Sequence, residues 1–104
     1  MVNALKTMEE YTKCIAENAL VVIDFTATWC GPCKMVGPKF VELAPEFPKV
    51  VFVKIDVDEN ADAAEACGIS AMPTFQFYKD GKKVSEVVGA SIEKVKEMVT
   101  KFNN

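Results

Sequence analysis

The sequence predicts an α/β fold with a central mixed five-stranded sheet and helices on both faces. Apolar runs rich in β-branched residues alternate with stretches whose apolar residues recur at helical spacing. The run Leu20–Phe25 is apolar apart from Asp24, which is typical of a strand covered on both sides. The last two expected strands are separated by Asp80-Gly81, a strong β-hairpin signal. Strands joined by helices should be parallel and the hairpin antiparallel, so the sheet is mixed.

Length and charge restrict the class of protein. A chain of 104 residues, half of them hydrophobic, suits one domain over residues 1–104. The net charge of −3 argues against a nucleic-acid partner, which would need a basic stripe. No apolar run approaches the roughly 20 residues of a membrane helix. The first ten residues carry Glu9 and Glu10 and lack the apolar core of a secretory signal. We therefore expect a cytoplasmic protein, mainly monomeric and without a membrane partner, and entry into the nucleus stays open.

The elements before the cysteine pair follow local signals. Val2–Leu5 suits a short edge strand. A helix is expected over Thr7–Asn18, because Thr7 and Glu10 have the spacing of a capping box and apolar residues follow at helical intervals. The strand Leu20–Phe25 comes next.

The longest expected helix runs from Gly31 to about Phe47. Pro38 lies inside it and should kink it, because proline removes a backbone donor and clashes with the preceding turn. Pro45 and Pro48 should end it.

The second half of the chain alternates in the same way. We expect a strand over Val50–Val57, a short helix over Asp58–Cys67 that Gly68 ends, and hairpin strands over Thr74–Lys79 and Lys82–Val88. Ser91 can cap the final helix. The buried face of that helix should comprise Ile92, Val95, Met98, Val99 and Phe102.

Two of the four cysteines, Cys30 and Cys33, are close in sequence and lie where a strand gives way to a helix. Close thiols in a reducing compartment indicate redox or metal chemistry. A zinc site needs four ligands, the chain has no His, and Cys14 and Cys67 belong to other expected helices, which disfavours metal. The pair alone still leaves metal binding, disulfide isomerisation and disulfide reduction open.

The expected position of Cys30 at a helix N-terminus bears on its reactivity. Only a thiolate attacks a disulfide. Unpaired backbone N–H groups and the helix dipole favour negative charge there, which should lower the pKa of Cys30. Cys33, three positions on, lies on the same helix face and can close an intramolecular disulfide. Gly31 and Pro32 suit the intervening turn, since proline fits a first helical turn.

Asp24 and Lys54 both interrupt apolar strands. Burial of Asp24 should raise its pKa, which suits a proton acceptor, although a buried and hydrogen-bonded structural carboxyl explains the sequence equally well. Lys54 lies in the next strand along the chain. It is either the buried partner of Asp24, able to modulate it, or a lysine whose ammonium extends to water.

Several short motifs form one pattern along the chain. They are Trp29-Cys30-Gly31-Pro32-Cys33-Lys34, Asp24-Phe25 before it, Met72-Pro73-Thr74 after it, Asp56-Val57-Asp58 and Val88-Gly89-Ala90. With this element order the chain resembles the thioredoxin family over essentially its whole length. Thr26-Ala27-Thr28 before the motif is similar to the cytosolic eukaryotic type. The thioredoxin family is itself a standard example of a cytosolic Cys-x-x-Cys pair with a lowered thiol pKa.

The resemblance implies the thioredoxin fold and a protein-disulfide reductant. Cys30 would attack a client disulfide, Cys33 would resolve the mixed disulfide, and Asp24, modulated by Lys54, would help deprotonate Cys33. Pro73 would be a cis-proline that faces the two sulfurs. No bound cofactor is implied beyond the redox-active disulfide Cys30–Cys33, because a flavin-dependent thioredoxin reductase would use NADPH to restore the dithiol.

The resemblance also implies a client-docking patch and a set of partners. The patch would comprise Trp29, Gly31, Pro32, Met72, Gly89 and Ala90. Clients would be disulfide-bearing proteins that resemble peroxiredoxin, ribonucleotide reductase and sulfoxide reductases. A disulfide oxidant or isomerase is the first alternative, although such proteins usually place His between the cysteines. A redox-dependent binding subunit of another enzyme is the second. Cys14 and Cys67 are interpreted as structural.

Overall fold

The computed structural model describes residues 2–103 and contains five strands, four α-helices and a short 3-10 helix. The strands are β1 (Asn3–Ala4), β2 (Leu20–Thr26), β3 (Val51–Asp56), β4 (Thr74–Lys79) and β5 (Lys82–Val88). The helices are α1 (Met8–Glu17), α2 (Gly31–Leu43), α3 (Ala61–Ala66), α4 (Ile92–Phe102) and the 3-10 helix η1 (Ala44–Glu46). Among these residues, no helix is long and apolar enough to cross a membrane.

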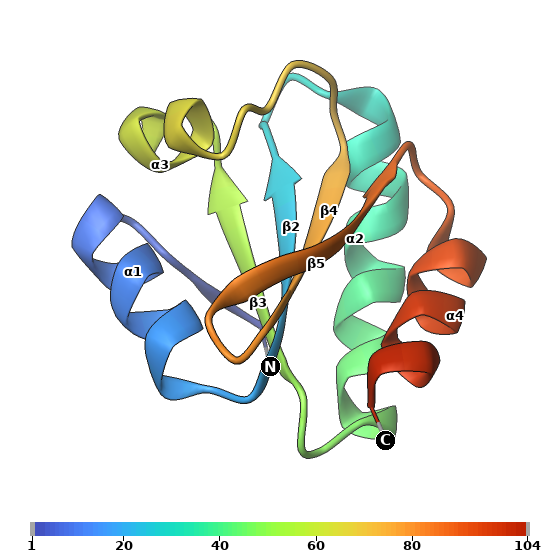
Figure 1. The fold of residues 1–104 in the computed structure, drawn as a ribbon. Helices are drawn as coiled ribbons and strands as arrows, with labels where there is room; N and C mark the ends of the chain where they lie inside the picture. The colour runs from blue at the N-terminus through green and yellow to red at the C-terminus, as the bar shows by residue number, and fades with distance from the viewer. Residues whose placement is uncertain (1, 104) are drawn as a thin grey trace.

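The strands form one mixed sheet in the order β1-β3-β2-β4-β5 (Figure 1). β3 pairs in parallel with both β1 and β2, whereas β4 pairs antiparallel with β2 and β5. This confirms the predicted mixed sheet with a C-terminal hairpin. Asp80 and Gly81 of the hairpin turn both have positive φ, 52° and 84°, which Asp and Gly tolerate better than most residues.

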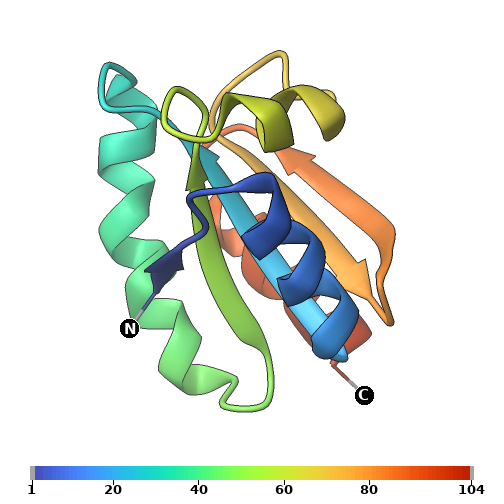
Figure 2. The same ribbon diagram turned by 90° about the vertical axis from the view of Figure 1, so that its left-hand side faces the viewer.

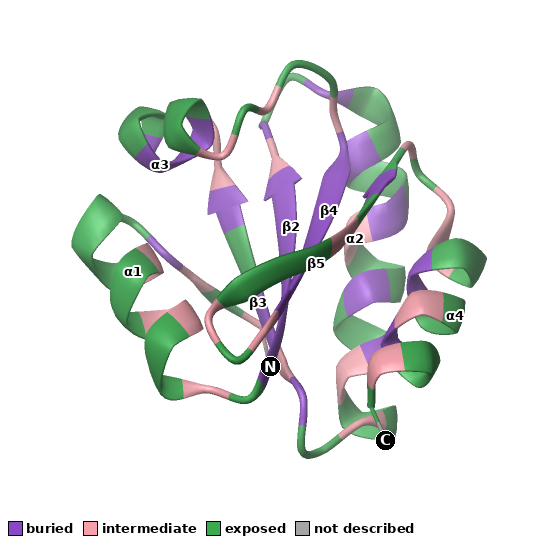
Figure 3. Cartoon of the chain, viewed as in Figure 1, coloured by how far each residue is buried: buried purple, intermediate pink, exposed green. Residues whose placement is uncertain are grey.

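The helices cover the sheet from both sides. Figures 1 and 2 show α1 and α3 against one face and α2 and α4 against the other. β2 lies at the centre and is buried from Leu20 to Phe25, as the continuous apolar run predicts (Figure 3). Because β2 is paired on both edges and covered on both faces, its C-terminal end is a firmly held platform for the cysteine pair.

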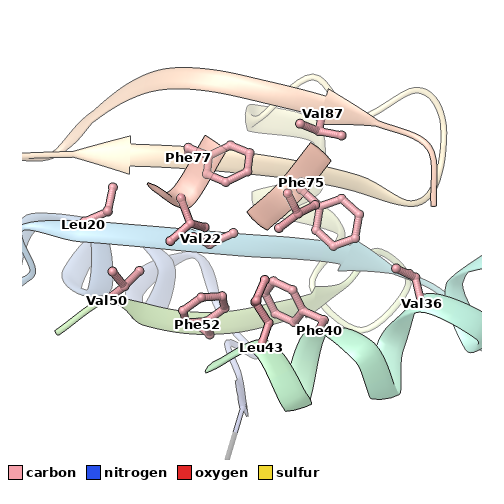
Figure 4. Close-up of a cluster of buried hydrophobic side chains, with 12 residues drawn as sticks. Leu20, Val22, Val36, Phe40, Leu43, Val50, Phe52, Phe75, Phe77 and Val87 are labelled. Atoms are coloured by element: carbon pink, nitrogen blue, oxygen red, sulfur yellow. The ribbon is translucent and has the colours of Figure 1, made fainter. Parts of the chain in front are cut away.

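Each face has its own core cluster. On the α2 and α4 side, the Phe40 ring lies 5.3 Å from that of Phe52 and 5.5 Å from that of Phe75, in the edge-on and tilted arrangements that aromatic rings prefer (Figure 4). The predicted face of α4 supplies buried Val95 and Val99 to this cluster, with its other three predicted residues packed at the edge. The α1 and α3 side contains a second cluster that includes Tyr78.

Several predicted elements are shorter in the structure. β1 has two residues rather than four. α2 ends at Leu43 and is followed by η1, while its α-helical assignment runs through Pro38 without a break. α3 begins at Ala61 rather than Asp58, because Asn60 is its N-cap and accepts a 3.4 Å hydrogen bond from the Ala63 amide.

Candidate active site

The cysteine pair lies where β2 leads into α2. Cys30 is the N-cap residue of α2, and Pro32 occupies the first turn of the helix, as predicted. Cys30 and Cys33 form a disulfide with a Cα–Cα separation of 5.3 Å. Their exposed fractions are 6% and 3%, so Cys33 is the more buried of the two.

The backbone of the first helical turn points at the Cys30 sulfur. The Cys33 amide donates a 3.2 Å hydrogen bond to Sγ of Cys30. A thiolate at this sulfur would accept the same bond in the reduced protein, and the positive end of the helix dipole would stabilise it further. This local structure supports the predicted attack by Cys30, which stays a prediction at this point.

Asp24 lies in the middle of β2 and is 3% exposed. Its Oδ1 has no hydrogen-bond partner among the residues that the structure describes. Burial raises the pKa of Asp24 from 3.8 to about 7, and the charge of Lys54 opposes this rise. Asp24 is therefore a buried carboxyl whose pKa burial raises, and its role as a proton acceptor stays a prediction.

A cavity of about 380 Å³ connects Asp24 with two lysines. Asp24, Lys34 and Lys54 contribute to its walls, together with apolar residues of α2. An unpartnered carboxyl oxygen beside such a cavity is a place where solvent can exchange a proton.

Lys54 is paired in register with Asp24 on the neighbouring strand, but its side chain is exposed. The interpretation of Lys54 as a buried partner is therefore wrong, because the long lysine stem carries the ammonium out of the sheet to water. The lysine still acts on Asp24 through its charge, since it lowers the pKa of the carboxyl relative to burial alone.

The Met72–Pro73 peptide bond is cis, as the resemblance implies. Pro73 is buried, and its carbonyl accepts a 2.9 Å hydrogen bond from the Gly89 amide, so two predicted site residues are joined by the backbone. Met72 packs against the small cluster of Ala27, Cys30 and Cys33. The loop before β4 therefore borders the disulfide.

Trp29 is the one predicted docking residue with a large exposed side chain, at 64%. Its Nε1 donates a 2.8 Å hydrogen bond to Oδ2 of Asp58. The other members of the expected patch divide into exposed Gly31, Pro32 and Ala90 and half-buried Met72 and Gly89.

Sequence reasoning assigned no role to Asp58, although Asp56-Val57-Asp58 belongs to the motif pattern. Asp58 follows the C-terminal end of β3, and β2 is parallel to β3. The C-terminal ends of adjacent parallel strands lie at the same end of a sheet. This rule could have placed Asp58 near Trp29 from the sequence alone.

The other two cysteines lie away from this site. Cys14 and Cys67 are free and half-buried, and both pack against the core cluster on the α1 and α3 side. Burial raises the pKa of the Cys14 thiol, which suits an unreactive side chain. Within the described part of the chain, no group of three or more His, Cys, Asp or Glu could hold a metal ion.

The disulfide joins the N-cap cysteine of α2 to a cysteine one turn later, just after the C-terminal end of the central strand β2. This arrangement defines a disulfide oxidoreductase. The comparisons with known proteins identify its family. The family model for thioredoxin matches residues 2–101. The chain belongs to the thioredoxin family.

Individual relatives agree with this assignment. A thioredoxin of Geodia cydonium is 54% identical over 104 residues, covering 97% of this chain and 98% of its own. The X-ray structure of Fasciola hepatica thioredoxin superposes with a TM-score of 0.94 at 45% identity, covering 97% of this chain and 99% of its own. A third structure has a TM-score of 0.93 at 40% identity and covers 96% of this chain and 94% of its own. It was described for thiol resolution in yeast mitochondrial 1-Cys peroxiredoxin through glutathione and thioredoxin systems.

Proposed function

We propose that this protein reduces disulfide bonds in client proteins and is recycled by a flavin-dependent thioredoxin reductase at the expense of NADPH. The observation that carries the proposal is the hydrogen bond from the Cys33 amide to Sγ of Cys30 at the start of α2. It supports Cys30 as the nucleophile and Cys33 as the residue that closes the disulfide. The activity is assigned to the cytoplasm.

The first step joins protein and client. The Cys30 thiolate attacks one sulfur of the client disulfide and forms a new S–S bond to it. The client's other sulfur leaves as a thiolate and takes up a proton. Trp29, Pro32 and Ala90 offer an exposed surface for the client, and the Met72 backbone pairs with an extended client segment, as in strand addition.

The second step releases the reduced client. Cys33 gives up its proton and attacks Sγ of Cys30, the bond between Cys30 and the client breaks, and the client sulfur leaves as a second thiolate. Asp24 accepts the proton of Cys33, for which a buried carboxyl with a pKa of about 7 is suited, because it changes protonation state near neutral pH. Two electrons pass to the client, and Cys30 and Cys33 are left as a disulfide.

Peroxiredoxin-like proteins are the first client class that we propose. A structural relative comes from work on thiol resolution in a peroxiredoxin, and the shared fold supports the same client class here. Ribonucleotide-reductase-like proteins and sulfoxide reductases are further candidates of the same chemistry, because each regenerates through a disulfide.

Reduction of insulin disulfides with NADPH and a thioredoxin reductase tests the proposal. The wild-type chain should reduce insulin rapidly, and Cys30→Ser should reduce it no faster than buffer. Cys33→Ser should accumulate mixed disulfides with insulin under oxidising conditions. Cys14→Ser is the matched control and should keep wild-type turnover, since Cys14 lies outside the site. Normal turnover by Cys30→Ser would contradict the assignment of the nucleophile.

A further inference from the structure

Gln76 lies at the centre of β4 and is fully buried. Its side-chain nitrogen donates two hydrogen bonds and its side-chain oxygen accepts one. Nε2 donates to the Cys67 carbonyl at 3.0 Å and to Oε1 of Glu86 at 2.8 Å, while Oε1 accepts from the Tyr78 hydroxyl at 2.7 Å. A buried polar side chain with this many partners is held in one orientation.

The hydrogen-bond partners of Gln76 determine the positions of its side-chain nitrogen and oxygen. A backbone carbonyl and a carboxylate only accept hydrogen bonds, so the NH2 group must face Cys67 and Glu86. The Tyr78 hydroxyl donates to the amide oxygen and accepts a 2.9 Å bond from the Tyr11 hydroxyl. Burial raises the pKa of Tyr11 to about 12 and also raises the pKa of Tyr78, so both hydroxyls keep their protons near neutral pH.

The Cys67 carbonyl belongs to the C-cap residue of α3. Beyond it, the Gly68 amide donates to the Glu65 carbonyl at 3.0 Å and the Ile69 amide to the Ala64 carbonyl at 3.1 Å. Gly68 has a φ of 70°, and these two bonds form a complete Schellman motif. The chain then leads directly into the loop that carries Met72 and Pro73.

β4 holds this loop at both of its ends. Gln76 bonds the Cys67 carbonyl, and the Thr74 hydroxyl donates to the Ala71 carbonyl. Thr74 and Gln76 are two positions apart in one strand and therefore point to the same side of the sheet. The path of the loop is thus set by side chains of the strand that follows it.

We propose that Gln76 is a positioning residue for client binding, which acts by fixing the end of α3 and so the placement of the loop Gly68–Met72 beside the disulfide. The inference rests on the proposed function, because it takes Met72 as part of the client-docking surface. Gln76 itself is fully buried and bonds neither Cys30 nor Cys33, so it does not act on the reacting sulfurs directly. Loss of its bond to Cys67 weakens docking and leaves the chemistry of Cys30 intact.

Three variants separate this role from a general contribution to folding. Gln76→Met keeps the length of the side chain and removes its bond to the Cys67 carbonyl. Tyr78→Phe removes the hydroxyl that bonds Oε1 of Gln76 and lies 3.6 Å from Sγ of Cys67, and it keeps both groups of the Gln76 bond to the Cys67 carbonyl, so it is the control for loss of the network alone. Glu86→Ala removes the other acceptor of Nε2 at the exposed end of the network.

Two substrates give the two readouts. Reduction of insulin requires docking of a protein. Reduction of the small disulfide 5,5′-dithiobis(2-nitrobenzoate) requires none, so its rate reports the reactivity of Cys30. Gln76→Met should raise the KM for insulin about fivefold, the equivalent of one hydrogen bond of about 1 kcal/mol, with an unchanged rate toward the small disulfide. Tyr78→Phe and Glu86→Ala should keep the wild-type KM.

A further variant keeps the test decisive if Gln76→Met does not fold. Gln76→Glu preserves the shape of the side chain and can donate to the Cys67 carbonyl only when protonated, with the Glu86 carboxylate beside it. Its KM for insulin, divided by that of the wild type at each pH, should fall toward one as the pH is lowered.

The outcomes are distinguishable. A wild-type chain that fails to reduce insulin would defeat the proposed function, and the role of Gln76 with it. Normal wild-type turnover with equal KM values in Gln76→Met and Tyr78→Phe, or a pH-independent ratio for Gln76→Glu, would defeat the role of Gln76 alone.

Discussion

The indole of Trp29 and the carboxylate of Asp58 are joined by a 2.8 Å hydrogen bond from Nε1 to Oδ2. The bond ties the residue before Cys30 to the turn after β3. Both side chains are exposed, and the Asp58 backbone is held separately by a 2.9 Å bond from its amide to Oδ1 of Asp56. Asp58 therefore fixes the orientation of the largest exposed aromatic side chain beside the disulfide.

Asp58→Ala should release Trp29 and raise the KM for a protein disulfide, because the indole loses its preferred orientation. The exposed site limits the loss of unfolding free energy to about 1 kcal/mol or less. Asp58→Asn is the matched control, since its side-chain oxygen still accepts from Nε1 and the KM should stay close to wild type. Trp29 is the only Trp, so its fluorescence emission reports the change directly. An emission spectrum of Asp58→Ala identical to wild type would argue against this role.

Asp24→Asn should change how stability depends on pH. The folded pKa of about 7 lies above the unfolded value near 3.8, so between these values the folded state binds more protons than the unfolded state. Wild-type stability should therefore fall as the pH rises from about 4 to about 7 and then level off.

Asp24→Asn lacks this titration, so its free energy of unfolding should rise relative to that of the wild type as the pH increases from about 4 to about 7. The gain reaches on the order of 4 kcal/mol, because each pKa unit corresponds to about 1.4 kcal/mol. Urea unfolding of both proteins from pH 4 to pH 8 measures the difference. A difference that does not vary with pH would show that the carboxyl is not buried as described.

Lys54→Met should raise the pKa of Asp24, because the variant removes the positive charge that opposes the effect of burial. A carbon-13 NMR titration of the Asp24 carboxyl measures the shift. Lys6→Met is the control, since Lys6 is exposed and is not among the groups that shift Asp24. Equal titration curves for Lys54→Met and wild type would mean that water screens the lysine completely.

Gly89→Ala and Gly31→Ala should differ in stability although a Cβ would meet no close neighbour at either position. Gly89 has a φ of 108°, which strains any residue with a Cβ, so its replacement should cost about 1–3 kcal/mol. Gly31 lies in the first turn of α2 without a positive φ, and alanine there should be neutral or stabilising. Thermal unfolding compares the two variants, and similar melting temperatures would exclude the backbone explanation.

Short-range patterns predicted most of the fold. The continuous apolar run of β2 and the Asp80-Gly81 turn correctly indicated a doubly covered central strand and a hairpin, because both signals are local. The strand order β1-β3-β2 is a long-range property that no local pattern encodes. The end of α3 and the start of α2 were likewise visible in Gly68 and Cys30, whereas the start of α3 was misplaced because Asn60, rather than Asp58, caps it.

The candidate site, like the fold, could be predicted from the sequence only in part. Cys30, Cys33 and Asp24 stand out from their neighbours in sequence, so the disulfide and the burial of Asp24 could be predicted, and the catalytic roles of the three residues stay predictions. The exposure of Lys54 depends on how its stem leaves the sheet, and the partners of Trp29 and Gln76 depend on which strands and helices meet in space. Those relationships appear only when Asp58 and Cys67 are brought together with residues distant in sequence.

The central position of β2 also governs how fast a proton can reach Asp24. Backbone amides of a strand that is paired on both edges and buried on both faces exchange with deuterium only when the whole domain opens, which is rare and slow. Local opening of the sheet would therefore deliver protons to Asp24 only slowly. If Asp24 accepts the proton of Cys33 as we propose, the cavity lined by Asp24, Lys34 and Lys54 offers solvent a route to the carboxyl that requires no opening of the sheet.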